Sequence, residues 1–349
     1  MTNRIGVVGV GASTAIGLDA PATAAAQRAG IAGFSEHPFM INKDGEPYIL
    51  ATVPSIHPGV TGEERYFQLV NSAYAEALEP LAGVSAEPFT ISVIIGLPEQ
   101  RPGLPSNLAK NLTAHLKSIC PEYCRIDEIK TAYRGHAAGL MTLRSANKLL
   151  EAGSSQFCLV GGVDSYIEAD TLEWLEENEQ LHMPSNAWGF MPGEASAFLL
   201  LCSMKTAKRF GLLPKAELLS TGYAEEKALI KTETVCIGEG LTAAVRDGCQ
   251  MLAENQKISQ MYCDQNGEAY RADEHGFMIA RLSDFFNDPS NYVAPADCWG
   301  DVGAASGLLF VNQICAAAEK NYGMGSVSML WTSSESGDRA AAVFLTDRS

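Results

Sequence analysis

A turn followed by a long apolar run occupies residues 189–202, which read GFMPGEASAFLLLC. Pro192 and Gly193 form a tight corner ahead of the run. The run from Ala195 to Cys202 shows no polar alternation, which is typical of a strand buried on both faces. It is far shorter than the roughly 20 residues that cross a bilayer. The stretch therefore predicts a central strand of an α/β fold and not a membrane span.

Strands and helices alternate on both sides of this run. On the N-terminal side we predict strands at 5–10, 89–96 and 157–163, helices at 21–29, 104–119 and 136–152, and a loop at 131–135. On the C-terminal side we predict strands at 216–221, 258–264 and 340–345, and helices at 240–255 and 301–320. Such alternation predicts an α/β architecture with largely parallel sheets and helices on both faces.

The two series of elements have similar content, which indicates one fold built from two similar halves. A charged stretch at 205–209, followed by Pro214, separates them. We therefore expect an N-terminal half over 1–204 and a C-terminal half over 205–349. Because no long linker rich in proline or serine intervenes, the halves should pack as one unit.

Charge and composition limit the classes of function. The 349 residues include 25 Lys and Arg against 41 Asp and Glu, a net charge of −16. This charge repels phosphate backbones and anionic membranes, so nucleic-acid or lipid binding is not expected as the main task. The N-terminus lacks the basic and apolar regions of a secretory signal, so a cytoplasmic location is expected.

Metal and cofactor motifs are weak. The nine cysteines form no C-x-x-C pair, which favours reduced thiols over a disulfide framework. Cys120 and Cys124 lie near His115, but tetrahedral zinc needs four ligands and no second pair supplies them. The glycines of residues 9–17 miss the spacing of the dinucleotide motif G-x-G-x-x-G, and neither a P-loop nor G-x-S-x-G occurs. We expect no metal and no cofactor.

Four segments, considered together, indicate a resemblance to a known family. They are 4–17, the opening strand and turn; 158–165, CLVGGVDS; 189–197, GFMPGEASA; and 300–307, GDVGAASG. In order and spacing they resemble the β-ketoacyl synthase branch of the thiolase-fold superfamily, whose own version of the third segment is G-F-x-P-G-E-G-A. The resemblance implies a thiolase fold of two tandem βαβαβαββ halves in five layers, α-β-α-β-α, and a homodimer or heterodimer.

The resemblance also implies a cysteine nucleophile at the start of the helix 136–152. There the helix dipole and free N–H groups lower the thiol pKa and hold an oxyanion. This chain has His136 at that position and no cysteine between Ile126 and Gln156. An imidazole is a poor acyl carrier, because an acyl-imidazole hydrolyses readily.

The family's other catalytic positions are changed as well. Asn266 and Asp301 stand where the resemblance places two histidines, and Ala296 stands where it places a lysine. An asparagine cannot act as a general base, and a carboxylate opposes a developing oxyanion. The gating loop near the C-terminus is replaced by residues 334–339, SESGDR. The chain therefore resembles a thiolase scaffold without the condensing residues.

The altered positions leave a set of candidate ligand-binding residues. His136 at a helix start, beside Arg134, could cradle a carboxylate or phosphate. It could equally be a neutral histidine that fills the space of the lost site, and we favour this interpretation. Asp301 facing His136 and Asn266 would form a polar network that closes the site. The candidates are Tyr133, Arg134, His136, Asp264, Asn266 and Asp301.

Two classes of function follow. The first is a degenerate ketosynthase-like scaffold or adaptor that pairs with itself, an active synthase or a client. It resembles either the chain-length-factor partners of polyketide synthases or the thiolase-like proteins encoded beside type VI secretion genes, and the short chain without a gating loop favours the latter. The alternative is an acyl-thioester transferase or hydrolase in which His136 works with Asp301 or Asp264.

Overall fold

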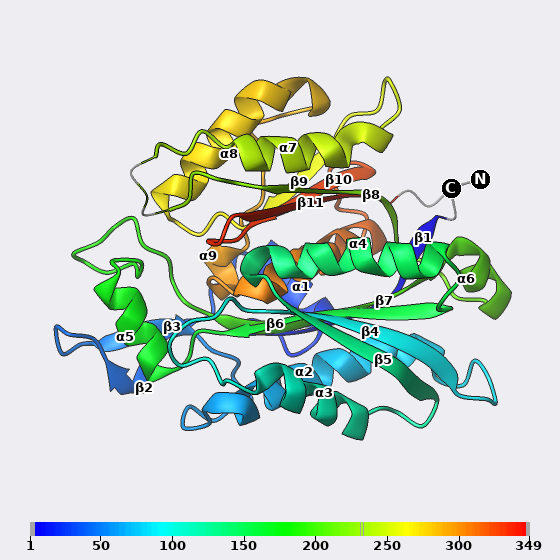
Figure 1. Ribbon diagram of the computed structural model, residues 1–349, viewed down its shortest axis with the longest axis horizontal. Helices are drawn as coiled ribbons and strands as arrows, with labels where there is room; N and C mark the ends of the chain where they lie inside the picture. The colour runs from blue at the N-terminus through cyan, green and yellow to red at the C-terminus, as the bar shows by residue number, and fades with distance from the viewer. Residues whose placement is uncertain (1–3, 231, 233, 347–349) are drawn as a thin grey trace.

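The computed structural model describes residues 4–230, 232 and 234–346. Figure 1 shows two sheet layers with helices between them and on both outer faces. Helices α2 and α3 cover one outer face, α7 and α8 cover the other, and α1, α4 and α10 lie in the middle. The predicted five-layer thiolase fold is therefore confirmed.

The strands form one mixed sheet in the order β5-β4-β6-β7-β1-β8-β11-β10-β9. They are β1 Ile5–Thr14, β4 Phe89–Leu97, β5 Cys124–Tyr133, β6 Phe157–Ser165, β7 Glu194–Ser203, β8 Ala216–Glu225, β9 Gln260–Cys263, β10 Val327–Ser333 and β11 Asp338–Leu345. Pairing of β1 with β8 over three residues joins the two layers at the centre of this order. A separate hairpin contains β2, Phe34–Ile41, and β3, Pro47–Ala51.

The expectation of largely parallel sheets is wrong. Only β4–β5, β4–β6 and β9–β10 pair in parallel among the described strands, and the pairs in the middle of the sheet are antiparallel. The central strand β7 is buried at every position, as its apolar run predicts. An uninterrupted apolar run indicates burial on both faces but does not fix strand direction, which explains the error.

The described helices are α1 Ala20–Arg28, α2 Gly62–Leu78, α3 Leu108–Ser118, α4 Ala138–Glu151, α5 Ala169–Glu177, α6 Met204–Phe210, α7 Glu239–Gly248, α8 Ala269–Leu282, α9 Ala296–Trp299 and α10 Ser306–Glu319. Short 3-10 turns occupy Glu79–Leu81, Gly135–Ala137, Cys249–Met251, Ser283–Phe285 and Gly303–Ala305. Two of these turns lead directly into α4 and α10, the helices buried between the sheets. None of the described helices is long and apolar enough to cross a membrane.

Several elements differ from the sequence prediction. Residues 131–133, expected in a loop, complete the edge strand β5. The strand was missed because its sequence, CRIDEIKTAY, mixes charged and apolar residues in the way that half-exposed edges do. Helix α7 ends at Gly248 rather than 255, and the helix expected from 301 is preceded by a turn and starts at Ser306.

Candidate functional site

His136 lies at the entrance of the buried helix α4. It is the middle residue of the 3-10 turn Gly135–Ala137, and Gly135 enters this turn with a φ of +56°, a conformation that favours glycine. The His136 side chain is 5% exposed. The turn therefore aims the imidazole into the interior, toward Asp301, and away from solvent.

Asp301 binds the His136 imidazole directly. Its carboxylate oxygens lie 2.8 and 2.9 Å from Nε2 of His136, and they also accept from the Asn266 side chain at 2.6 Å and from the backbone N–H of Gly303 at 2.9 Å. These acceptor contacts assign the proton on Nε2 to a bond with Asp301. The structure thus brings His136, Asn266 and Asp301 into one network.

The protonation states follow from this geometry. Burial alone lowers the pKa of His136, but the Asp301 carboxylate outweighs it and raises the pKa above the ordinary 6.5. Burial alone raises the pKa of Asp301, but His136 and Arg271 hold it well below its usual range. Below about pH 6.5 the pair is therefore an imidazolium and a carboxylate. This result differs from the neutral histidine that we favoured from the sequence.

Arg271 of α8 completes the network. Its guanidinium donates to Asp264 and to the Ser333 carbonyl, both at 2.8 Å, and to Glu268 at 3.1 Å. Its remaining nitrogen, Nη2, lies 3.3 Å from His136 Nε2. The Arg271 side chain is 3% exposed, and a buried cation of this kind is tolerated only because carboxylates surround it. The guanidinium therefore occupies the space directly beside Nε2 of the imidazole.

The start of α4 is capped by a side chain. The backbone N–H of Ala137 donates to Ser334 Oγ at 2.8 Å, and that hydroxyl donates in turn to the carbonyl of Arg134 at 2.5 Å. Free N–H groups at a helix start are what stabilises an oxyanion in acyl transfer. At Ala137 that donor is already engaged.

Little empty volume borders the network. A cavity of about 40 Å³ touches His136, with Glu99, Arg101, Tyr166 and Glu335 among its lining residues. A second cavity, beside Asp301 on the other side, measures about 10 Å³. Ligand pockets for organic molecules span roughly 300–1,000 Å³, whereas a single water needs roughly 10–15 Å³. These spaces suit a few water molecules, not an acyl chain.

Two predicted ligand-binding residues lie outside the cluster. The Tyr133 hydroxyl accepts from the backbone N–H of Ala109 at 3.1 Å, and its ring packs with the core on the α3 side of the sheet. The Arg134 side chain is half exposed and pairs with Asp338 at 3.2 Å. The expectation that both side chains lie beside His136 is therefore wrong. The backbone leaves strand β5 at these residues, so neighbouring side chains point to different layers.

Asp264 does join the cluster, but as a structural acceptor. It accepts from Arg271 and from the backbone N–H of Ser333 at 2.6 Å, and the residue is 7% exposed. Sequence reasoning missed Arg271, Glu268 and Glu335. The available signal was Glu268 three residues before Arg271 on one helix, a spacing that is far more common on solvated faces.

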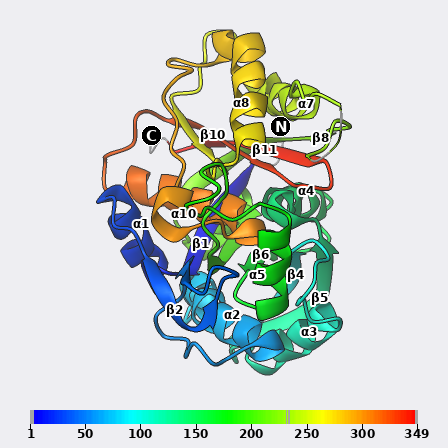
Figure 2. The same ribbon diagram turned by 90° about the vertical axis from the view of Figure 1, so that its left-hand side faces the viewer.

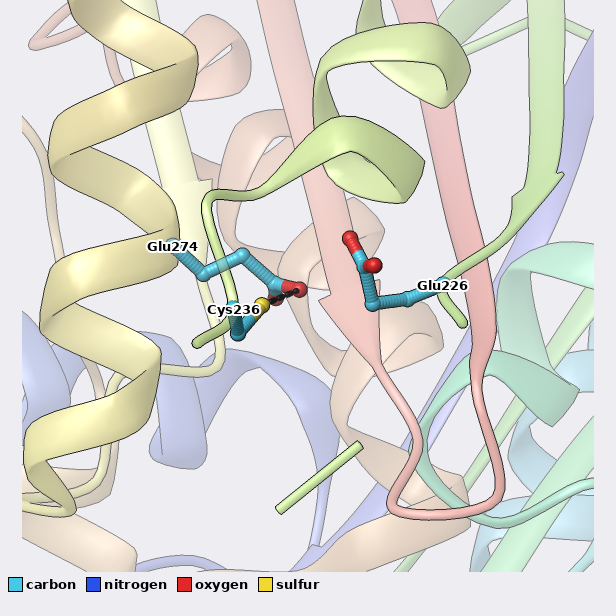
Figure 3. Close-up of side chains that lie close together, drawn as sticks. All are labelled: Glu226, Cys236 and Glu274. Atoms are coloured by element: carbon cyan, nitrogen blue, oxygen red, sulfur yellow. Dashed lines mark hydrogen bonds between the residues drawn. The ribbon is translucent and has the colours of Figure 1, made fainter. Parts of the chain in front are cut away.

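A separate group of side chains invites a metal interpretation. Glu226, which directly follows β8, converges with Cys236 and with Glu274 from within α8, as Figure 3 shows. Glu274 is paired with Arg339 at 2.8 Å, and Glu226 accepts from the backbone N–H of Gly240 at 2.8 Å. Burial raises the pKa of Cys236 to about 11, and its thiol donates to Glu274. With carboxylates engaged and the thiol protonated, this group fits a structural network better than a metal ion.

Comparison with known proteins agrees on the fold. No sequence family model and no curated protein matches the chain. Among solved structures, the chain is similar to the ishigamide ketosynthase/chain length factor, with a TM-score of 0.81 and 18% identity over 100% of both chains. It is similar to a type II polyketide synthase acyl-carrier protein in complex with its ketosynthase, with a TM-score of 0.80 and 15% identity over 100% of both.

A third similar structure is a longer ketosynthase chain. The ketosynthase from module 6 of the bacillaene synthase of Bacillus subtilis 168 matches with a TM-score of 0.79 and 14% identity, over 99% of this chain and 72% of that one. Identities this low establish a shared fold and leave function to the site itself. The chain thus has the ketosynthase-like thiolase fold.

Proposed function

We propose that this protein is a ketosynthase-fold subunit without condensing activity, which works by binding another protein chain. The observation that carries the proposal is the closed network at the start of α4. His136, Asn266 and Asp301 occupy the positions where the family resemblance puts the nucleophile and two histidines, and Arg271 lies beside them. The degenerate positions are therefore His136, Asn266 and Asp301, and their side chains stabilise the contact between the two halves, 1–204 and 205–349.

The alternative, an acyl-thioester transferase or hydrolase centred on His136, fits the geometry less well. A nucleophilic or general-base histidine needs a ring nitrogen that faces substrate. Nε2 of His136 is bound to Asp301 and lies beside the Arg271 guanidinium, which leaves only Nδ1 to face a substrate. The neighbouring cavity of about 40 Å³ does not admit an acyl group with its carrier.

The edge strand β5 is the surface that supports pairing. It is ten residues long and pairs with β4 on one side, while no described strand covers its other edge. An open edge of this length favours strand addition by a second chain. We propose that a second copy, or another ketosynthase-like chain, extends the sheet there, within the cytoplasm.

Two partner classes make this proposal specific. A role like that of a chain length factor requires an active ketosynthase as partner. One structural neighbour is named as a ketosynthase/chain length factor. An adaptor role in type VI secretion requires a secreted effector or a spike component instead. Affinity purification of the tagged full chain from its own cell, followed by mass spectrometry, separates the two roles by which partner is enriched.

The pairing itself is tested by sedimentation velocity of the purified full chain. We expect a dimer at micromolar concentration that becomes a monomer in Ala132→Arg, because the long charged side chain would crowd, and carry an unpaired charge against, a strand added at β5. Leu213→Arg is the matched control, since Leu213 is 87% exposed and lies in the segment after α6, outside strand β5. A wild-type monomer that also purifies without a partner would contradict the proposal. So would turnover of acyl thioesters that disappears in His136→Ala.

A further inference from the structure

A further hollow lies away from the network. A cavity of about 580 Å³ opens between α1 and α10, which lie side by side in Figure 2. It shares no lining residue with the cavities beside His136 and Asp301. Its walls are small apolar side chains, including Val10, Ala24, Ala25 and Ala316. Short side chains on two facing helices leave space that longer ones would fill.

One residue that lines this cavity carries a buried polar atom without a partner. Asn312 of α10 lines the wall and is 2% exposed. Its amide nitrogen donates to the carbonyl of Gly11 at 3.2 Å, which orients the side chain, whereas its oxygen Oδ1 has no hydrogen bond within the described chain. A buried acceptor without a donor costs roughly 1–3 kcal/mol. A ligand hydroxyl or N–H placed here would remove that cost.

Cations gather at the rim. Arg28, Lys215 and Lys320 all line the cavity, in a chain whose net charge is −16. Lys215 pairs with Glu319 at 3.1 Å, but neither Arg28 nor Lys320 has a carboxylate of the described residues within ion-pair distance. The Arg28 guanidinium instead stacks on the Tyr322 ring, 3.9 Å from its centroid. Such a rim attracts an anionic group.

We propose that this cavity binds a small organic anion with an apolar body. The apolar body lies against the alanines of α1 and α10, the anionic group meets Lys320 and Arg28 at the rim, and a hydroxyl or N–H of the ligand donates to Asn312 Oδ1. The volume of about 580 Å³ falls within the roughly 300–1,000 Å³ typical of small-molecule sites. This proposal is independent of the proposed pairing and of the His136 network.

Two fluorescent dyes test the proposal on the full chain. 1-Anilinonaphthalene-8-sulfonate has fused rings, one N–H and one sulfonate, and N-phenyl-1-naphthylamine has the same rings and N–H without the charge. We expect one sulfonate dye per chain, bound about tenfold tighter than the neutral dye at low salt, with the difference shrinking as salt rises. Equal affinity of the two dyes would overturn the anion site.

Matched variants locate the bound dye. Ala25 and Ala22 are both exposed on α1, but only Ala25 lines the cavity. Ala25→Trp should abolish stoichiometric binding and Ala22→Trp should not. Lys320→Glu should weaken binding by about five- to tenfold, and Lys117→Glu on α3 should leave it unchanged. The lysine variants decide the question if Ala25→Trp fails to fold. Unchanged binding in Lys320→Glu, or equal binding in the two tryptophan variants, would refute the site.

Discussion

The two buried helices begin with nearly the same sequence. Residues 135–140 read GHAAGL and residues 303–308 read GAASGL. In each case a glycine in the left-handed region, with φ of +56° at Gly135 and +47° at Gly303, opens a three-residue 3-10 turn that continues into a helix of 14 residues. The repeated backbone device places both helices between the sheets.

Each helix start is also closed by the opposite half. Ser334 accepts from the N–H of Ala137, and Asp164 accepts from the N–H of Ala304 at 3.1 Å. The difference lies in the residue after the glycine, which is His136 in one half and Ala304 in the other. The methyl group of Ala304 needs no hydrogen-bond partner. The imidazole of His136 needs one and is bound by Asp301, two residues before the turn that leads into α10. Both helix starts thus have glycine at the first position of the turn, but their side chains differ at the second position.

The strongest way to break this arrangement is Asp301→Ala. Its carboxylate neutralises His136, so its removal leaves the buried imidazolium without its carboxylate partner, whereas Arg271 keeps Asp264 and Glu268. We expect a loss of about 3–5 kcal/mol in the free energy of unfolding, measured by denaturant titration at pH 6.

Asp297→Ala is the matched control, because Asp297 is four residues away and exposed. It should change the stability by less than about 0.5 kcal/mol. If Asp301→Ala were as stable as this control, the network would not stabilise the contact between the halves.

His136→Ala makes the two helix starts more alike, and its effect depends on pH. Because Asp301 raises the pKa of His136 above 6.5 despite burial, the imidazolium contributes stability that is fully present below about pH 6.5 and is lost as pH rises through the folded pKa. We expect the variant to lose about 1–3 kcal/mol at pH 6 and less at alkaline pH.

Denaturant titrations of both proteins from pH 5 to 9 measure this difference. The double variant with Asp301→Ala serves as control, since its loss should be smaller than the sum of the single losses when the two side chains interact. A difference between wild type and His136→Ala that does not change with pH would refute the charged pair.

Much of the scaffold follows from sequence pattern. The apolar run from Ala195 to Cys202 predicted β7, observed from Glu194 to Ser203, because an uninterrupted apolar segment bounded by a turn has few other solutions. The edge strand β5 and helix α2 were missed. The burial of β5 depends on neighbours far along the chain, which local periodicity does not report. Helix α2, by contrast, buries residues at a regular helical spacing, among them Leu69, Ala73 and Ala77, so its pattern was present in the sequence.

The site was predictable in part. Its central residues, His136, Asn266 and Asp301, were selected because they depart from a family pattern at defined positions. Arg271 was not, because a lone arginine on a helix normally indicates a solvated face. Only the folded chain brings Asp264 and Asp301 close to it, and that proximity makes its burial possible.

The smallest expected effect is that of restoring the nucleophile, His136→Cys. A thiol at this position still faces Arg271, the N–H of Ala137 is still bound by Ser334, and the cavity beside it holds about 40 Å³. We therefore expect no acyl adduct after incubation with an acyl-CoA, measured by intact-protein mass spectrometry. His136→Ala, treated in the same way, reports any reaction of the nine native cysteines. An adduct found only in the cysteine variant would show that an acyl group reaches this helix start, and that the single substitution, not the closed network, separates this chain from an acyl-accepting one.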